Sequence, residues 1–154
     1  MPQAIDEIAW KSAHHWDIRV YFEDTDAGGI VFYANYLKFM ERARTEWLRS
    51  LGVEQQAIAS ELGVGFVVSD LDIKYRQPAR LDDLLTVQTL ITQAGRASLN
   101  FAQRVLRAQT VLAHGNIRVG CVDLKALRPV ALPNVVRMQI TTNPIQTREK
   151  DAGC

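Results

Sequence analysis

The sequence predicts an α+β domain in which a five-stranded, mostly antiparallel sheet wraps around one long helix. Three observations support this fold class. One long segment has the helical spacing of apolar residues, five shorter segments have the pattern of strands, and the last four strands follow one another closely. Connections that short leave no room for crossover helices, so the strands pair antiparallel and the single long helix covers much of one sheet face.

The composition limits the possible functions. The 154 residues are 47% hydrophobic and 23% charged, which is ordinary for one globular domain that buries a core. The net charge is +1, so no strong field favours nucleic acid or an anionic membrane. No run approaches the roughly 18 apolar residues that span a bilayer, and residues 1–16 lack the apolar region of a signal peptide. We therefore expect a cytoplasmic protein with no membrane span and no nucleic-acid partner.

The first strand and the long helix follow from periodicity. Ile18, Val20 and Phe22 alternate with other residues and predict a half-buried strand. Apolar residues then recur at spacings of three and four over residues 33–51, and Gly52 ends this predicted helix. Its apolar positions are Tyr36, Met40, Ala43, Trp47 and Leu51.

The remaining elements are shorter. Residues 55–62 predict a short helical segment. Four more strands are predicted over residues 67–75, 85–91, 99–105 and 111–124. Pro129 and Pro133 end the strand pattern.

We therefore divide the chain into an N-terminal extension at 1–15, the folded domain at 16–138 and a polar, mobile tail at 139–154. Cys121 lies in a predicted strand and Cys154 ends the sequence, so no disulfide framework or metal-ligand spacing is present. We expect neither a metal nor an organic cofactor.

The segment Glu23-Asp24-Thr25-Asp26-Ala27-Gly28-Gly29 lies between the first strand and the long helix. Acidic groups favour a helix N-terminus because its free N–H groups and dipole stabilise negative charge, and adjacent glycines let a ligand approach the backbone. Such a site could polarise a carbonyl beside a carboxylate. For Asp26 alone, a helix cap or an Asx turn is the competing interpretation.

These residues resemble a known family. The segments 20–31, 34–36 and 41–46 resemble the hotdog-fold acyl-CoA thioesterases of the 4-hydroxybenzoyl-CoA thioesterase family, most closely the Tol-Pal-associated branch, and the similarity extends over about residues 16–134. The resemblance implies a hotdog fold, hydrolysis of acyl-CoA to free acid and CoA, and no cofactor. It also implies a homodimer that usually pairs again into a homotetramer.

The resemblance also assigns site residues. Asp26 matches the catalytic aspartate, and the main-chain N–H of Tyr33 matches the donor that polarises the thioester carbonyl. Gly28 and Gly29 lie at the substrate, and Arg96 and Ser98 correspond in position to residues that hold the nucleotide and phosphates of coenzyme A. The closest branch usually has His at position 33, whereas the hydroxybenzoyl-CoA thioesterases have Tyr, so the sequence leaves the substrate subclass open.

Thioester chemistry agrees with these assignments. A free aspartate is ionised at neutral pH, so Asp26 could attack the carbonyl as a nucleophile or act as a general base on water. We interpret Asp24 and Glu23 as structural or solvated, Asn35 as scaffold and Glu41 as a salt-bridge residue.

Other functions remain as alternatives. An aromatic, hydroxybenzoyl-CoA type of thioesterase would keep the same chemistry. A noncatalytic adaptor for acyl carrier protein or envelope assembly would bind without turnover, and its partners would leave no motif on a neutral surface. A hotdog dehydratase is disfavoured because no histidine occurs between His15 and His114.

Overall fold

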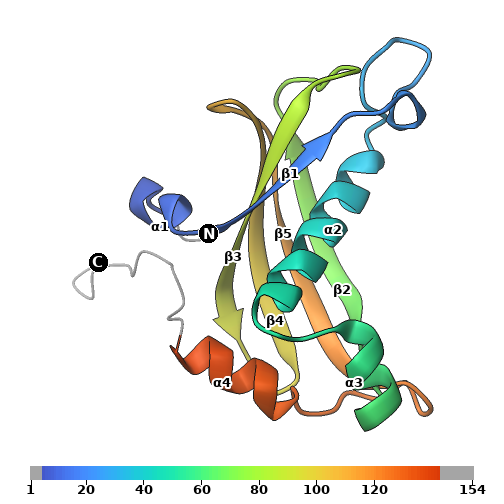
Figure 1. The fold of residues 1–154 in the computed structure, drawn as a ribbon, viewed down its shortest axis with the longest axis vertical. Coiled ribbons are helices and arrows are strands. Elements are labelled where there is room, and N and C mark those ends of the chain that lie inside the picture. The colour runs from blue at the N-terminus through green and yellow to red at the C-terminus, as the bar shows by residue number, and fades with distance from the viewer. Residues whose placement is uncertain (1–4, 143–154) are drawn as a thin grey trace.

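The structure, a computed structural model, describes residues 5–142 of the chain (Figure 1). The helices and strands follow in the order α1 Glu7–Lys11, β1 His14–Arg19, 3-10 helix η1 Phe22–Asp24, α2 Asn35–Ser50, α3 Gln55–Leu62, β2 Val64–Tyr75, β3 Leu84–Ala94, β4 Ser98–Arg107, β5 Thr110–Asp123 and α4 Asn134–Thr142.

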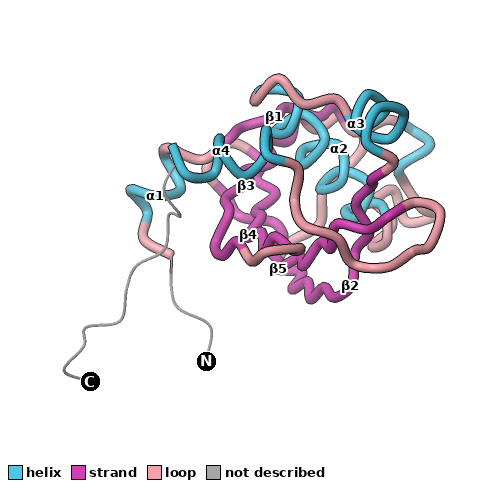
Figure 2. The backbone as a smooth tube through the Cα atoms, turned by 90° about the horizontal axis from the view of Figure 1, so that it is seen from below, coloured by secondary structure: helices cyan, strands magenta, loops and turns pink. Residues whose placement is uncertain are grey.

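The five strands form one sheet in the order β1-β3-β4-β5-β2, and every neighbouring pair is antiparallel. The sheet curves around α2, as the view in Figure 2 shows. The sequence-based prediction of an α+β fold with one long helix against an antiparallel sheet is confirmed.

The core lies between α2 and the concave face of the sheet. Tyr36, Met40 and Ala43 are buried at the predicted helical spacing, and Phe39 and Leu48 are buried beside them. They pack against buried sheet residues that include Leu85, Val87, Val105, Leu112 and Ile117. Burial of this apolar stripe, rather than helix propensity, holds α2 in place.

The first strand differs from the prediction. β1 begins at His14, inside the predicted N-terminal extension, and ends at Arg19. The expected strand residue Phe22 instead lies in η1 and is exposed. The change occurs because the N–H of Tyr21 donates to the carboxylate of Asp24, which turns the chain away from the sheet.

Two helices were not predicted. The helix α4 carries the described chain to Thr142, past the predicted tail boundary at 139, and residues 143–154 of that tail lie outside the described residues. The helix α1 covers the convex face of the sheet, where Trp10 is buried against Leu90 and Ala102. Asp6 caps α1 by accepting the N–H of Ala9.

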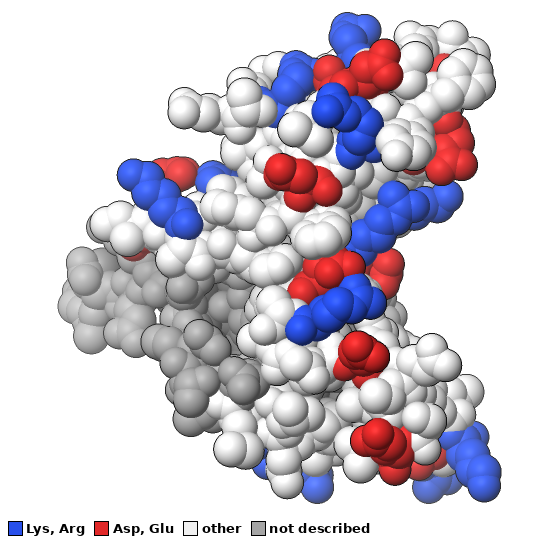
Figure 3. All heavy atoms as spheres, viewed as in Figure 1, with Lys and Arg blue, Asp and Glu red and all other residues white. Residues whose placement is uncertain are grey.

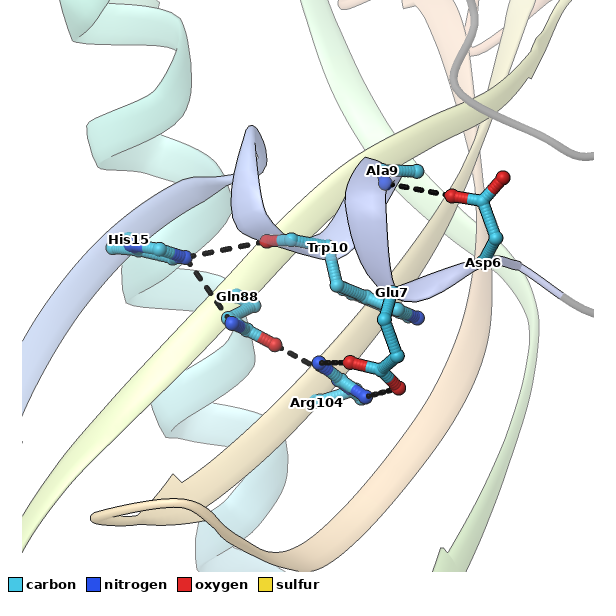
Figure 4. Close-up of polar contacts among 7 residues, drawn as sticks. All are labelled: Asp6, Glu7, Ala9, Trp10, His15, Gln88 and Arg104. Carbon is cyan, nitrogen blue, oxygen red and sulfur yellow. Dashed lines mark hydrogen bonds and ion pairs between the residues drawn. The ribbon is translucent and has the colours of Figure 1, made fainter.

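Polar contacts hold α1 on the sheet (Figure 4). The Arg104 guanidinium lies 4.3 Å from the centre of the Trp10 ring and pairs with the Glu7 carboxylate. Its Nε donates to Gln88 Oε1 at 2.8 Å, which directs the Gln88 amide nitrogen toward His15. The N-terminal extension is therefore a packed part of the domain from Glu7 onward.

β2 is a long, exposed edge strand. Val67, Val68, Leu71 and Tyr75 each leave nearly half of their surface exposed, although β2 pairs with β5 on its other side. An edge strand of 12 residues with exposed apolar side chains invites pairing with another chain.

Charged side chains of both signs are interspersed on the face of the molecule seen in Figure 3. None of the helices between residues 5 and 142 has the length and apolar character needed to cross a membrane.

Candidate active site

A buried carboxylate organises the segment between η1 and α2. Asp24 Oδ2 accepts the N–H of Tyr21 at 2.8 Å, and Asp24 Oδ1 accepts from Asn35 Nδ2 at 2.9 Å. The Asp24 carbonyl also accepts the N–H of Phe32 at 2.9 Å. Asp24 thus joins the start of the loop to the first residue of α2, which is the structural role predicted for Asp24 and Asn35.

Asp26 lies at the tip of the same loop in an Asx turn. Its Oδ1 accepts the N–H of Gly28 at 2.8 Å, and its backbone pairs with Ile30 and Gly29. Asp26 is therefore a turn residue, as the competing interpretation predicted. The side chain is exposed, however, and its Oδ2 accepts no hydrogen bond from any described residue, so the carboxylate keeps a free oxygen.

The two glycines serve different purposes. Gly29 has a φ of 78°, in the left-handed region that L side chains rarely adopt. A Cβ at Gly28 would lie 3.2 Å from Asp26 Oδ1 and would press on the carboxylate. Gly28 therefore sets the position of the Asp26 side chain.

Tyr33 presents its backbone just before α2, which begins at Asn35. Its N–H donates to no acceptor within the described part of the chain, while its carbonyl accepts the Tyr75 hydroxyl at 2.8 Å. The N–H therefore stands free at the positive end of the helix dipole. Helix α2 starts two residues later than predicted, and the predicted donor remains available.

Aromatic rings surround this helix start. Tyr33 contacts Phe32 and Tyr75, with ring centres 4.8 and 6.4 Å away, and Tyr36 contacts Tyr75 at 5.3 Å. Burial raises the pKa of Tyr75, and its tyrosine neighbours raise it further, so its hydroxyl stays protonated and can donate to Tyr33. The sequence did not identify Tyr75 as a site residue, although its place at the end of a strand was visible.

The loop before β3 supports both ends of the Asp26 loop. The Asp83 carbonyl accepts the N–H of Val20, and the Ala79 carbonyl accepts that of Val31. The Asp83 carboxylate pairs with Arg107 at 2.8 Å and accepts the N–H of Arg80 at 2.9 Å. Backbone hydrogen bonds to this loop therefore fix both ends of the Asp26 loop.

Arg96 and Ser98 lie at the other end of the molecule. They follow the end of β3, whereas the Asp26 loop contacts residues just before its start. The 11 residues of β3 span roughly 35 Å. Within one chain the structure therefore brings together Asp26, Gly28, Gly29 and Tyr33 but not Arg96 and Ser98.

Glu41 is not the predicted salt-bridge residue. Its carboxylate accepts the Thr45 hydroxyl at 2.7 Å and is not ion-paired with any described residue. It lies with Arg44 in a groove between α2 and β2. Sequence reasoning did not consider Arg44, although its position four residues after Met40 places it beside the buried stripe.

Between residues 5 and 142, no group of three or more His, Cys, Asp or Glu side chains is arranged to hold a metal ion. Cys121 is buried as a free cysteine, and burial raises the pKa of its thiol.

Comparison with known proteins identifies this arrangement. A family profile described as the thioesterase superfamily matches residues 28–114. The acyl-CoA thioesterase YbgC of Haemophilus influenzae is 48% identical over 120 residues, which cover 78% of this chain and 88% of that protein. The acyl-CoA thioester hydrolase YbgC of Escherichia coli O157:H7 is 48% identical over 122 residues, with coverage of 79% and 90%.

Solved structures agree. A 1,4-dihydroxy-2-naphthoyl-CoA thioesterase from Synechocystis aligns with a TM-score of 0.79 and 25% identity, covering 86% of this chain and 98% of that one. A gentisyl-coenzyme A thioesterase aligns with a TM-score of 0.74 and 28% identity, covering 80% and 98%. The chain belongs to the thioesterase superfamily and has its hotdog fold, which confirms the family, fold and enzyme class predicted from the sequence.

Asp83 makes the support of the site sensitive to acid. Partial burial favours the protonated acid, but hydrogen bonds from Arg107 and Arg80 and their positive charges outweigh it and lower the pKa of Asp83 below its ordinary 3.8. This stabilisation is present above about pH 4 and is lost as pH falls through the lowered pKa. Between about pH 6 and pH 2, we expect the free energy of unfolding in urea to fall by about 1 kcal/mol less in Asp83→Asn than in wild type.

The control is Asp82→Asn, because Asp82 has a φ of 71° that Asn tolerates, and its hydrogen bonds with other described residues use only its backbone. An equal acid-induced loss of unfolding free energy in Asp83→Asn and in wild type would contradict the stabilising role of the Asp83 carboxylate.

Gly28→Ala should damage activity more than stability. The new methyl group displaces the Asp26 carboxylate by a few tenths of an ångström, which we expect to lower kcat/KM about tenfold with little change in Tm. A Cβ at Gly29 would meet no atom within 4 Å, but the positive φ of Gly29 is strained for alanine. Gly29→Ala should therefore cost about 1 kcal/mol of stability instead. Thermal melting and thioester hydrolysis of both variants test the contrast. Equal changes in Tm and in kcat/KM in the two variants would refute it.

Proposed function

We propose that this protein hydrolyses acyl-CoA thioesters, with the Asp26 carboxylate as nucleophile or general base and the Tyr33 N–H as the donor to the thioester carbonyl. The observation that carries the proposal is the joint anchoring of these two groups. Asp26 keeps a free oxygen and Tyr33 a free N–H on one loop, and Asp24 joins that loop to the start of α2. The acyl-CoA thioesterases among the relatives support the substrate class.

Two routes use the same groups. In the first, Asp26 attacks the carbonyl carbon, the C–S bond breaks to release CoA thiolate, and water hydrolyses the resulting mixed anhydride. In the second, Asp26 takes a proton from water, the water oxygen attacks the carbonyl carbon, and the C–S bond breaks to release CoA thiolate. We favour the first, because a carboxylate is a weak base for water. Single-turnover hydrolysis in labelled water distinguishes them, since only the anhydride route can place label in Asp26.

In both routes negative charge develops on the carbonyl oxygen. A backbone N–H fixed at a helix start stabilises that charge without reorganising, and one such donor is worth about a hundredfold or more in rate. Because the donor belongs to the main chain, the presence of Tyr rather than His at position 33 leaves this step intact.

We propose a homodimer formed through β2. The apolar edge of β2 would be covered by antiparallel pairing with the same strand of a second copy. Such a twofold pairing places the far end of the partner beside the Tyr75 end of β2 and so beside the Asp26 loop. The partner's Arg96 and Ser98 would then hold the phosphates of the CoA whose thioester lies at Asp26, which accounts for their separation within one chain.

The broader setting remains a prediction. A homotetramer and a Tol-Pal association follow from the family resemblance, and a cytoplasmic location is expected from the apolar pattern of the sequence. A noncatalytic adaptor for acyl carrier protein or envelope assembly is the alternative function. Aromatic acyl-CoA is the second candidate substrate class. The rings of Phe32, Tyr33 and Tyr75 at the helix start favour it, as do the aromatic substrates named for two structural relatives.

Asp26→Asn should reduce kcat by about a thousandfold or more, because an amide can neither attack the carbonyl nor take a proton. The assay follows free thiol from short-chain, long-chain and hydroxybenzoyl-CoA thioesters. Glu23→Gln, at an exposed neighbouring carboxylate, is the matched control and should retain activity. Turnover by Asp26→Asn would refute the role of Asp26, and no turnover of any ester by wild type would favour the noncatalytic adaptor.

Mixed dimers test whether the site is shared between two copies. If Asp26 and Arg96 act from different chains, a dimer of Asp26→Asn with Arg96→Ala has one intact site and one doubly altered site. Equal mixing after unfolding and refolding should then recover about a quarter of the wild-type kcat/KM at low substrate concentration. Activity no higher than the mean of the two parents would show that both residues act within one chain.

A further inference from the structure

A groove leads away from the candidate site between α2 and β2. It contains two adjoining cavities of about 430 and 100 Å³. The larger is lined by Leu37, one turn from Tyr33, by Leu71, and by the exposed cations Lys38 and Arg42. The smaller is lined by apolar residues that include Phe66, Leu99, Phe101 and Val119. Glu41, Arg44 and Val68 line both cavities and mark their junction.

The direction of the groove follows from the two elements that form it. The Tyr75 hydroxyl contacts Tyr33 at the start of α2, while Phe66 lies near the other end of β2. An acyl chain whose thioester carbonyl meets the Tyr33 N–H can therefore run along α2 toward the smaller cavity. Arg44 lies about 16 Å further along this path, and helical side chains point back toward the N-terminus.

Arg44 is fixed in this groove and incompletely paired. Its Nη1 donates to Gln103 Oε1 at 3.0 Å. Gln103 is fully buried, and its amide nitrogen donates to the Met40 carbonyl and the Thr89 hydroxyl. The guanidinium has four further N–H donors, and none has a hydrogen-bond acceptor among residues 5–142. Burial lowers the pKa of Arg44 while the charge of Glu41 raises it, so this is a desolvated cation beside an acid.

None of these Arg44 nitrogens is among the buried unpaired atoms of the described residues, so they reach solvent, and the neighbouring Glu41 carboxylate offers only acceptors. A hydroxyl group suits this pair, because it accepts from Arg44 and donates to Glu41. A carboxylate at the junction would pair with Arg44 but be repelled by Glu41, since Lys38 and Arg42 line only the larger cavity. A plain alkyl chain would displace water from the Arg44 donors without replacing its hydrogen bonds.

We propose that Arg44 and Glu41 determine acyl specificity by binding a hydroxyl group on the distal part of the acyl chain. This inference rests on the proposed acyl-CoA hydrolysis at Asp26 and names the class of acyl group that the same site selects.

The test compares ω-hydroxyacyl-CoA with the unsubstituted acyl-CoA of the same length, from octanoyl to dodecanoyl, in wild type and Arg44→Met. Wild type should prefer the hydroxylated chain by about tenfold in kcat/KM at one chain length, and Arg44→Met should abolish that preference. Arg49→Met, at an exposed position of the same helix, is the control and should keep it. The same preference in Arg44→Met as in wild type, or none in wild type, overturns the proposal.

Two further measurements keep the result decisive. Glu41→Met, at an exposed position, should also reduce the preference and serves if Arg44→Met does not fold. Calorimetric binding of non-hydrolysable thioether analogues separates this proposal from the catalytic one, because hydroxyl preference in binding supports the groove even without turnover. Arg44→Met could instead change the sedimentation of the protein and keep the preference for the hydroxylated chain. That result would make the groove a contact between copies and overturn the proposal.

Discussion

The candidate site depends on the buried carboxylate of Asp24. A loop that carries a reactive acid must be exposed at its tip, so its position has to be fixed at its base. The Asp24 carboxylate accepts hydrogen bonds from Tyr21 and Asn35, and the Asp24 backbone carbonyl accepts a third from Phe32. Together these bonds connect the segment after β1 to the start of α2. Hydrogen bonds to a buried charge are among the stronger ones in proteins, and a buried charge that loses them is destabilised. The separation of Asp26 from Tyr33 is therefore determined largely by a residue that takes no part in the chemistry.

The rest of the fold supports that connection from two sides. The apolar stripe of α2 fixes the direction of the helix, so its dipole and the free Tyr33 N–H point to one place. The loop at residues 79–83 accepts N–H groups from Val20 and Val31, which flank the Asp26 loop. Stability and reactivity are thus divided between neighbouring residues, with buried groups holding the backbone and exposed groups available to substrate.

Much of this arrangement could be predicted from the sequence. The periods of 3.6 and 2 residues identified α2 and the strands, and the acidic, glycine-containing segment before α2 identified the candidate site. The sequence could not show features that depend on one local hydrogen bond or on residues far apart in the chain. Phe22 fitted an alternating strand because periodicity cannot detect the Asp24–Tyr21 hydrogen bond that ends it. Arg96 and Ser98 were assigned to the same site by resemblance, but only the strand register shows that β3 separates them from Asp26 in one chain. Arg44 was missed because a charged residue beside an apolar stripe is normally solvated, and its contact with Gln103 joins positions 59 residues apart.

The most direct test of the account is a crystal structure of the wild-type protein with a 2-oxoalkyl thioether analogue of acyl-CoA, which keeps the carbonyl but cannot be hydrolysed. The account predicts the carbonyl oxygen at about 2.7–3.1 Å from the Tyr33 nitrogen, with the free Asp26 oxygen facing the carbonyl carbon or a water beside it. A carbonyl bound away from Tyr33, or an Asp26 carboxylate turned from it with both oxygens paired to protein, would contradict it.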